Sequence, residues 1–379
     1  MSINFALFPG RMFPAVAHDA SSLPLRDVPA ATHEILSDYL DSRFPEVTTI
    51  GSPVAEAAEH LRSFVLGGGK RIRPLYGWAG FLGAGGLESG EDPEAVLRAV
   101  SALEFIQACA LIHDDIIDSS DTRRGSPTVH RRMEHQHRRE DWLGASDHFG
   151  RSVAILIGDL ALTWAEDMLN DSGLSDAALR RTRTPWRAMR TEVIGGQILD
   201  ISLEATASED IALAESVNRF KTAAYTIERP LHLGAAIADA PEEVTQAFRH
   251  YGREVGIAFQ LRDDVLGIFG DPSITGKPSG DDLREGKRTV LLALALAAAD
   301  ERDPAAAARL RGAVGTHLDD EELARMTGII EASGALDEVE RRIHTLVESG
   351  IAHLNVSSLS PEVRTALAEL AVRSTERRK

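Results

Sequence analysis

Two clusters of acidic residues in this sequence have the spacing of metal ligands. The first contains Asp114, Asp115 and Asp118, and residues four apart lie on one face of a helix. Three carboxylates at the C-terminal end of a buried helix repel one another and oppose the helix dipole. A cation should compensate them, and hard oxygen ligands on one face suit Mg²⁺. A solvated acidic helix end without a role is the alternative interpretation.

The second cluster contains Asp263 and Asp264, three residues after Gln260 and next to Arg262. It also lies near the end of a long apolar helix. Two such clusters that face each other across a helical bundle could hold several metal ions around one polyanion. Read alone, the second cluster could be an acidic helix terminus beside Arg262.

Basic residues stand near helix ends and acid clusters, although the formal net charge of the chain is −17. Arg binds phosphate through two parallel hydrogen bonds and Lys binds it as a point charge. The pattern therefore indicates a metal–phosphate site. Arg71 and Arg262 are the cations that we expect most readily to be solvated surface charges. The set is Lys70, Arg71, Arg73, Arg123, Arg124, Lys221, Lys277 and Lys287.

The elements that must position these residues are predicted to be helices. The chain is 43% hydrophobic and only 5% aromatic, it is rich in Ala and Leu, and it shows no sustained period-2 alternation. We expect an all-α protein with a poorly ordered extension at 1–29 and one bundle-like domain at 30–379. The polar segments 119–147 and 270–287 are predicted to be surface loops, the first with broken helix. The expected helices begin near residue 31 and cover 93–118, 149–169, 176–203, 211–222, 223–238 and 241–269, with four or five more after 287.

Composition excludes several other classes. The net charge of −17 argues against nucleic-acid binding. The single cysteine, Cys109, excludes an intrachain disulfide and fits a reducing cytoplasm. No signal peptide and no uncharged apolar run of about 18 residues is evident, so we expect no integral membrane association.

Five segments together resemble the trans-isoprenyl diphosphate synthases, in wording closest to the bacterial geranylgeranyl type. They are GGGKRIRP, LIHDDIIDSSDTRRGSPTVH, GGQILD, FKTAAYTIERP and FQLRDDVLGIFGD. The resemblance covers about residues 30–375. It implies an all-α bundle around a deep central cavity, usually a homodimer, and an enzyme that joins isopentenyl diphosphate to an allylic diphosphate.

The resemblance also implies roles for individual residues. Asp114, Asp118 and Asp263 would bind three Mg²⁺ ions, supported by Asp115 and Asp264. The allylic diphosphate would be contacted by Arg123, Lys221 and Lys277, with Gln260 and Lys287 as further contacts. Isopentenyl diphosphate would be bound by Lys70, Arg73, Arg124 and Gln107. Thr222 and Gln197 fall where the family lines the reaction centre.

One position departs from the family pattern, because Gly267 stands where the second motif has a third acid. Three other interpretations stay open. A class I terpene cyclase would pair the first motif with a different metal triad and would not need GGGKRIRP. A non-catalytic partner subunit would be marked by loss of an acid motif. A phosphohydrolase would not need a second diphosphate site.

Small residues before the first acid cluster bear on product length. Ala110 and Cys109 precede Asp114, and a Phe or Tyr there would block growth near C15 in the family pattern. Ile106 lies about 12 Å down the helix from Asp114 at 1.5 Å per residue. We expect a C20 product, geranylgeranyl diphosphate, while C15 and C25 or longer remain open.

Overall fold

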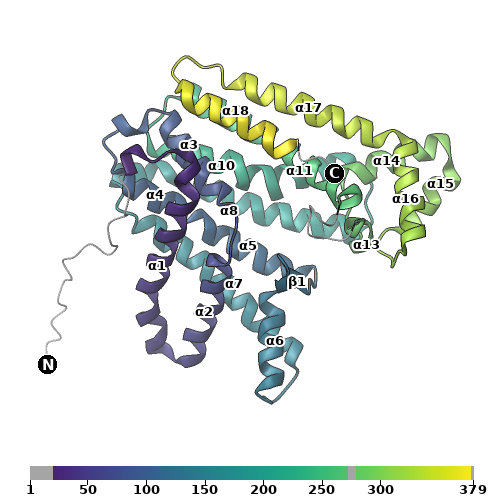
Figure 1. Ribbon diagram of the computed structural model, residues 1–379, viewed down its shortest axis with the longest axis horizontal. Helices are drawn as coiled ribbons and strands as arrows, with labels where there is room; N and C mark the ends of the chain where they lie inside the picture. Colours follow the sequence, from purple (N-terminus) through teal and green to yellow (C-terminus); the bar gives the residue numbers. More distant parts are fainter. Residues whose placement is uncertain (1–19, 272–278, 377–379) are drawn as a thin grey trace. The chain divides into compact units, whose positions relative to one another are not determined.

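The computed structural model describes residues 20–271 and 279–376, and nearly all of their regular structure is helical (Figure 1). The all-α prediction is therefore confirmed. The chain packs as two compact units. Unit 1 contains the described residues up to Pro74 together with Asp92–Ile116 and Val129–Gly173, and unit 2 contains Leu75–Glu91, Ile117–Thr128 and the remainder from Leu174. The division passes through the first acid cluster, because Asp115 belongs to unit 1 and Asp118 to unit 2.

Unit 1 is built from helix pairs. Figure 1 shows α1 and α2 as neighbours, and α6 packs along α7. Two short 3₁₀ turns precede α1, so the described structure begins inside the extension expected at 1–29. Its elements are the turns Ala20–Ser22 and Leu25–Asp27 and the helices α1 (Val28–Ile50), α2 (Ser52–Leu66), α4 (Pro93–Ser101), α5 (Leu103–Ile117), α6 (Val129–Arg139) and α7 (Ser146–Asn170).

The core of unit 1 joins helices far apart in the sequence. The rings of Tyr39, Phe105 and Trp164 pack edge to face with centroids 5.4 to 6.4 Å apart. The hydroxyl of Tyr39 donates to the carbonyl oxygen of Trp164 at 3.2 Å. This cluster fixes α5, which carries the first acid cluster, against α1 and α7.

Unit 2 is larger. Its helices are the part of α3 (Ile72–Gly83) from Leu75 onward, α8 (Asp176–Ala205), α9 (Ile211–Val217), η4 (Asn218–Glu228), α10 (Arg229–Ile237), α11 (Glu242–Phe269), α13 (Asp281–Glu285), α14 (Val290–Arg302), α15 (Pro304–Ala313), α16 (Asp320–Ser333), α17 (Ala335–His353) and α18 (Pro361–Thr375). A short 3₁₀ turn at Gly86–Glu88 and a two-stranded antiparallel hairpin, β1 (Thr122–Arg123) and β2 (Ser126–Pro127), complete it.

Helix α11 is the centre of unit 2, where it packs against η4, α10 and α17 (Figure 1). The hydroxyl of Tyr251 on α11 is buried and donates to the carbonyl oxygen of Leu367 on α18 at 2.7 Å. Capping residues begin several of the surrounding helices. In a capping box before α16, for example, the side chain of Asp319 accepts from the backbone N–H of Glu322. The side chain of Glu322 accepts from the backbone N–H of Asp319.

The structure differs from the predicted elements at four places. The segment 270–287, predicted to be a surface loop, contains the short helix α13. The expected break between residues 222 and 223 is wrong, because η4 continues there as a π-helix between α9 and α10. The helix expected at 93–118 is divided at Ala102 into α4 and α5. The polar segment 119–147 contains a hairpin and the regular helix α6, where a loop with broken helix was predicted.

One stretch of the described chain has the length and hydropathy of a membrane-spanning helix, namely Pro93–Ile117 with a mean hydropathy of 1.7. It carries charged residues, and 78% of its most apolar window is buried inside the protein. The stretch, which consists of α4 and α5, therefore belongs to the core of the protein.

Arg71 and Glu104 form a buried ion pair within unit 1. Both side chains are only 5% exposed, and Nη1 of Arg71 lies 2.7 Å from Oε2 of Glu104. Removing one partner of a buried pair leaves an uncompensated charge and costs about 3–5 kcal/mol. We predict that Glu104→Gln lowers the free energy of unfolding by about 3 kcal/mol, measured by urea denaturation.

The exposed Glu321, which pairs with Arg325 on α16, gives a matched control. Glu321→Gln should cost about 0.5 kcal/mol or less. The double variant Arg71→Met/Glu104→Leu should regain most of the loss, because it removes both charges. Equal costs for Glu104→Gln and Glu321→Gln would contradict this account.

Candidate active site

Helix α5 carries Asp114 and Asp115 of the first acid cluster and the residues expected to set product length, all within unit 1. Asp115 is 1% exposed, and Asp114 is partly buried. Ile106 is fully buried, while Gln107 and Ala110 are partly exposed. The helix thus presents small and apolar side chains below its carboxylates, in the order that the sequence predicts.

Cys109 is held as a neutral thiol beside His113. Its sulfur lies 3.7 Å from Nδ1 of His113, and Nε2 of that ring lies 3.0 Å from the carbonyl oxygen of Ile155 on α7. Because a carbonyl oxygen can only accept, Nε2 carries the proton and Nδ1 accepts from the thiol. Burial, with a smaller contribution from Asp159, raises the pKa of Cys109 to about 12. The Cys109 side chain is therefore a small, uncharged group on α5.

The expectation that Arg71 and Arg262 are solvated surface charges is wrong. Arg71 is buried, pairs with Glu104 and donates to the carbonyl oxygen of Val65 at 2.6 Å. Arg262 is also buried and binds both carboxylate oxygens of Glu340 at 2.6 and 2.7 Å. Both arginines hold the fold together. Of the neighbouring cations in unit 1, Lys70 is exposed and Arg73 is 7% exposed.

In unit 2, a chain of hydrogen bonds joins η4 to the second acid cluster. Thr222 donates to Oε1 of Gln260 at 2.7 Å, and Nε2 of Gln260 donates to Oδ1 of Asp264 at 2.8 Å. Asn218 donates to the other oxygen of Asp264 at 3.4 Å. Burial raises the pKa of Asp264 to about 7 against the effect of these donors, and the nearby Asp282 and Asp263 raise it further. Asp263 itself is only partly buried.

Lys221 stands beside Asp200, the last residue of the GGQILD segment, for which no role was predicted. Its Nζ lies 2.5 Å from Oδ2 of Asp200 on α8. Glu204, one turn further along α8, has a pKa raised to about 7 by burial and then by the charges of Asp200 and Asp118. Lys221 and Lys287 partly offset that rise. The four-residue spacing of Asp200 and Glu204 could have drawn attention to both.

Lys287 connects the end of the first acid cluster with α13. Its Nζ lies 2.9 Å from Glu285 and 3.5 Å from Asp282. Burial disfavours the charge of Lys287, but the carboxylates of Asp282, Glu285 and Asp118 outweigh it and raise its pKa. Asp118 is exposed just beyond α5. The structure therefore brings Asp118, Lys221 and Lys287 into one electrostatic cluster within unit 2.

The remaining predicted residues occupy different positions. Arg123 lies in β1, and the exposed Arg124 follows it with a left-handed backbone (φ 53°). Gln197 lies on α8, where its buried Nε2 finds no hydrogen-bond acceptor among the residues that the structure describes. Lys277 lies outside the described residues. The pairing of Asp114 with Asp263 joins residues of the two units and stays a prediction.

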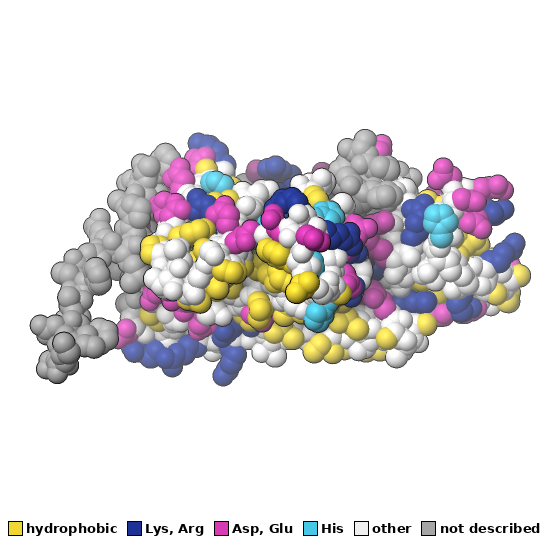
Figure 2. All heavy atoms as spheres, turned by 90° about the horizontal axis from the view of Figure 1, so that it is seen from below, with side chains coloured by type: hydrophobic (Ala, Val, Ile, Leu, Met, Phe, Trp, Pro, Cys, Tyr) yellow, Lys and Arg dark blue, Asp and Glu magenta, His cyan; other side chains and the backbone are white. Residues whose placement is uncertain are grey.

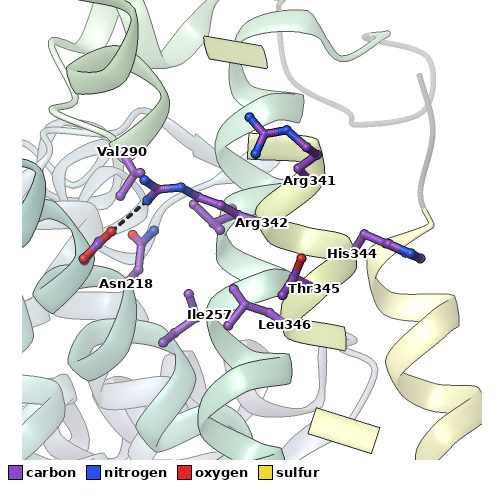
Figure 3. A pocket seen from close by; sticks show the side chains of 10 residues that line it. Asn218, Ile257, Val290, Arg341, Arg342, His344, Thr345 and Leu346 are labelled. Atoms are coloured by element: carbon purple, nitrogen blue, oxygen red, sulfur yellow. Dashed lines mark hydrogen bonds and ion pairs between the residues drawn. The ribbon is translucent and has the colours of Figure 1, made fainter. Parts of the chain in front are cut away.

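A cavity of about 690 Å³ also lies within unit 2, between α11 and α17 (Figure 3). Ile257, Leu261, Val290 and Leu346 give it an apolar lining, and Arg342 pairs with Glu215 at its side at 2.8 Å. Among the predicted substrate-binding residues that the structure describes, none lines it.

Known proteins resemble this chain along most of its length. The family model for polyprenyl synthetase matches residues 54–328. The chain is 36% identical over 317 residues to geranylfarnesyl diphosphate synthase of Aeropyrum pernix, covering 83% of this chain and 90% of that protein. It is 30% identical to geranylgeranyl diphosphate synthase of Methanosarcina mazei, covering 88% and 94%.

Solved structures give the same result. The crystal structure of geranylgeranyl pyrophosphate synthase from Corynebacterium glutamicum, complexed with isoprenyl diphosphate and magnesium, superposes with a TM-score of 0.91 at 61% identity. The match covers 94% of this chain and 100% of that one. The chain therefore belongs to the polyprenyl synthetase family.

Proposed function

We propose that this prenyltransferase joins isopentenyl diphosphate to an allylic diphosphate and releases geranylgeranyl diphosphate, C20. The observation that carries the proposal is the cluster in unit 2, where Lys221 and Lys287 stand among Asp118, Asp200 and Asp282. The carboxylates can bind metal cations, and the lysines can bind a polyanion. The cluster therefore suits a ligand that contains both. The class of substrate is inferred from the relatives, which are isoprenyl diphosphate synthases.

The allylic diphosphate is assigned to the acid clusters and the cations beside them. Asp114, Asp118 and Asp263 are the proposed metal ligands, with Asp115 and Asp264 in support. Arg123, Lys221, Lys277, Gln260 and Lys287 are the proposed diphosphate contacts. Thr222 and Gln197 belong to the reaction centre in this proposal, and the bond from Thr222 to Gln260 would orient the latter.

Isopentenyl diphosphate is assigned to Lys70, Arg73 and Arg124, with Gln107 as a further contact. Arg73 is almost buried, which suits a guanidinium that meets a phosphate in a site closed to water. Arg124 holds a left-handed backbone at the hairpin, a conformation that costs about 1 kcal/mol or more in a residue other than glycine. Such strain is common at functional positions.

The carboxylates fit magnesium ions that are bound jointly with substrate. Across residues 20–271 and 279–376, no three His, Cys, Asp or Glu side chains converge closely enough to enclose a metal. Mg²⁺ usually takes one or two protein carboxylates and completes its shell with water and phosphate oxygens. We propose three ions, which would stabilise the charge that develops on the departing diphosphate.

The residues of the chain would contribute to each stage of the reaction. Lys221 and Lys287 would hold the diphosphate and stabilise it as it leaves. The double bond of isopentenyl diphosphate would attack the allylic cation, and the departing diphosphate would accept the proton that is lost. Apolar side chains of α5 would exclude water, which would otherwise quench the cation.

The C20 length rests on α5, because the relatives' names differ between geranylfarnesyl and geranylgeranyl diphosphate synthase. Ala110 and the neutral thiol of Cys109 leave room for a chain longer than C15. Ile106 is fully buried one turn deeper and would limit growth. Longer products remain the alternative.

We further propose that the enzyme is a cytoplasmic homodimer. Hydrophobic side chains reach the surface among charged ones (Figure 2). On α8, Ile194, Ile198 and Ile201 are 54%, 59% and 40% exposed and share one helical face. An exposed apolar stripe of this kind is typical of a protein interface.

The first prediction concerns the product. Purified protein with Mg²⁺, labelled isopentenyl diphosphate and dimethylallyl, geranyl or farnesyl diphosphate in turn should yield, after dephosphorylation, a C20 alcohol. A C15 alcohol or one longer than C20 would keep the reaction and contradict the argument from Ala110 and Cys109. No condensation with any primer, in folded protein, would contradict the proposed activity and favour a non-catalytic partner subunit.

Product length should respond to side-chain volume at position 110. Ala110→Phe fills the space below the first acid cluster, so we expect the main product to shorten from C20 to C15. Ala110→Ser is the matched control and should keep C20. Chromatography of the dephosphorylated products gives the result, and an unchanged C20 product from a folded Ala110→Phe enzyme would show that α5 does not form the floor.

The dimer should depend on the stripe on α8. Ile198→Glu places a charge at its centre, and we expect sedimentation to show a monomer where the wild type is a dimer. Ile50→Glu, at an isoleucine at the end of α1 that is 69% exposed, should remain dimeric. A dimeric Ile198→Glu protein would rule out this face as the interface.

A further inference from the structure

The two acid clusters of this chain differ at one position. In the first, acids occupy positions i, i+1 and i+4 as Asp114, Asp115 and Asp118. In the second, Asp263 and Asp264 are followed by Gly267 at i+4. Helix α11 continues to Phe269, so Gly267 lies on the same helical face as Asp263.

The space beside Gly267 is filled by a carboxylate from another helix. A Cβ atom at Gly267 would stand 2.9 Å from Oδ1 of Asp282 and would overlap Oδ2. Real Cβ atoms do not approach other atoms so closely, so a side chain at position 267 and the present position of Asp282 exclude each other. Asp282 therefore places its carboxylate where the side chain of residue 267 would begin.

Several contacts hold Asp282 at this position. Ser279 donates to the carbonyl oxygen of Ile268 at 3.1 Å, which ties the approach to α13 onto the last turn of α11. Leu283 is 1% exposed, and its carbonyl oxygen accepts from the backbone of Gly315 at 2.8 Å. The residues on both sides of α13, Gly280 and Gly286, have left-handed backbones with φ of 73° and 84°. These contacts fix the turn against α11 and against the segment that follows α15.

The charge of Asp282 also belongs to the cluster that surrounds the proposed diphosphate. Its Oδ1 lies 3.5 Å from Nζ of Lys287, and Lys287 is influenced by Asp118 as well. The charge of Lys287 is thus stabilised both by Asp118, the i+4 acid of the first cluster, and by Asp282. Asp282 is 9% exposed, which is low for a carboxylate whose only task is to be solvated.

We propose that Asp282 supplies, from α13, the third carboxylate that the second acid cluster lacks at Gly267. In this role it is a positioning residue: it sets the charge around Asp263 and orients Lys287, and so favours binding of Mg²⁺ together with diphosphate. The inference rests on the proposed function. It also explains how a chain with glycine at this position can retain a complete acid cluster.

Calorimetric titration of inorganic pyrophosphate in the presence of Mg²⁺ tests this without turnover. We expect Asp282→Asn to weaken binding about tenfold and to lower kcat about 10²-fold, with a much smaller change in KM for isopentenyl diphosphate. Asp281→Asn changes charge equally in the same turn of α13 and should stay within about twofold of the wild type. Equal binding by the two variants would overturn the proposal.

A swap of the carboxylate separates this role from a structural one. Gly267→Asp alone should displace Asp282 and impair binding. The double variant Gly267→Asp/Asp282→Gly returns the carboxylate to α11 and should bind at least about tenfold more tightly than Asp282→Gly. A folded double variant that binds no better than Asp282→Gly would overturn the proposal. If the wild type transfers no prenyl group, the proposed function fails, while the titrations still decide the role of Asp282.

Discussion

The surplus of carboxylates in unit 2 is the constraint on which the site depends. Asp118, Asp200, Glu204, Asp264 and Asp282 lie in one electrostatic neighbourhood with Lys221 and Lys287. Asp264 and Glu204 both have a pKa raised to about 7, mainly because they are buried. Keeping such groups charged requires added positive charge. In a ligand that combines divalent cations with a diphosphate, the cations neutralise the carboxylates and the diphosphate neutralises the lysines. Neither ion would do both alone.

The packing of unit 2 serves this neighbourhood. The π-helix η4 lies against both α8 and α11, and it carries Lys221 and Thr222 on consecutive positions. Lys221 can approach Asp200 because Gly196 on α8 has no side chain, and a Cβ atom there would stand 2.7 Å from the Cα of Lys221. Thr222 meets Gln260 on the other helix. A π-helical turn often marks a functional site. Here it allows two adjacent residues to contact two different helices, Lys221 on α8 and Thr222 on α11.

Local patterns in the sequence predict the helical class and both acid clusters, because spacings of one and four residues are set by the helix itself. Asp282 could not be found this way, since its importance comes from Gly267 and Lys287, which lie outside its own helix. The buried roles of Arg71 and Arg262 also depend on distant partners, Glu104 and Glu340. The π-helix was missed because its residues keep ordinary helical propensity, so only packing distinguishes it.

Thermal unfolding of the full chain tests the requirement for both ions most directly. The midpoint would be measured with Mg²⁺ alone, with inorganic pyrophosphate alone and with the two together. Ligands that bind only the folded state raise the midpoint, and the rise grows with the logarithm of the ratio of ligand concentration to dissociation constant. The account predicts a small shift from each alone and a much larger shift from the pair than the two single shifts combined. Stabilisation by pyrophosphate alone that matches the effect of the pair would contradict it.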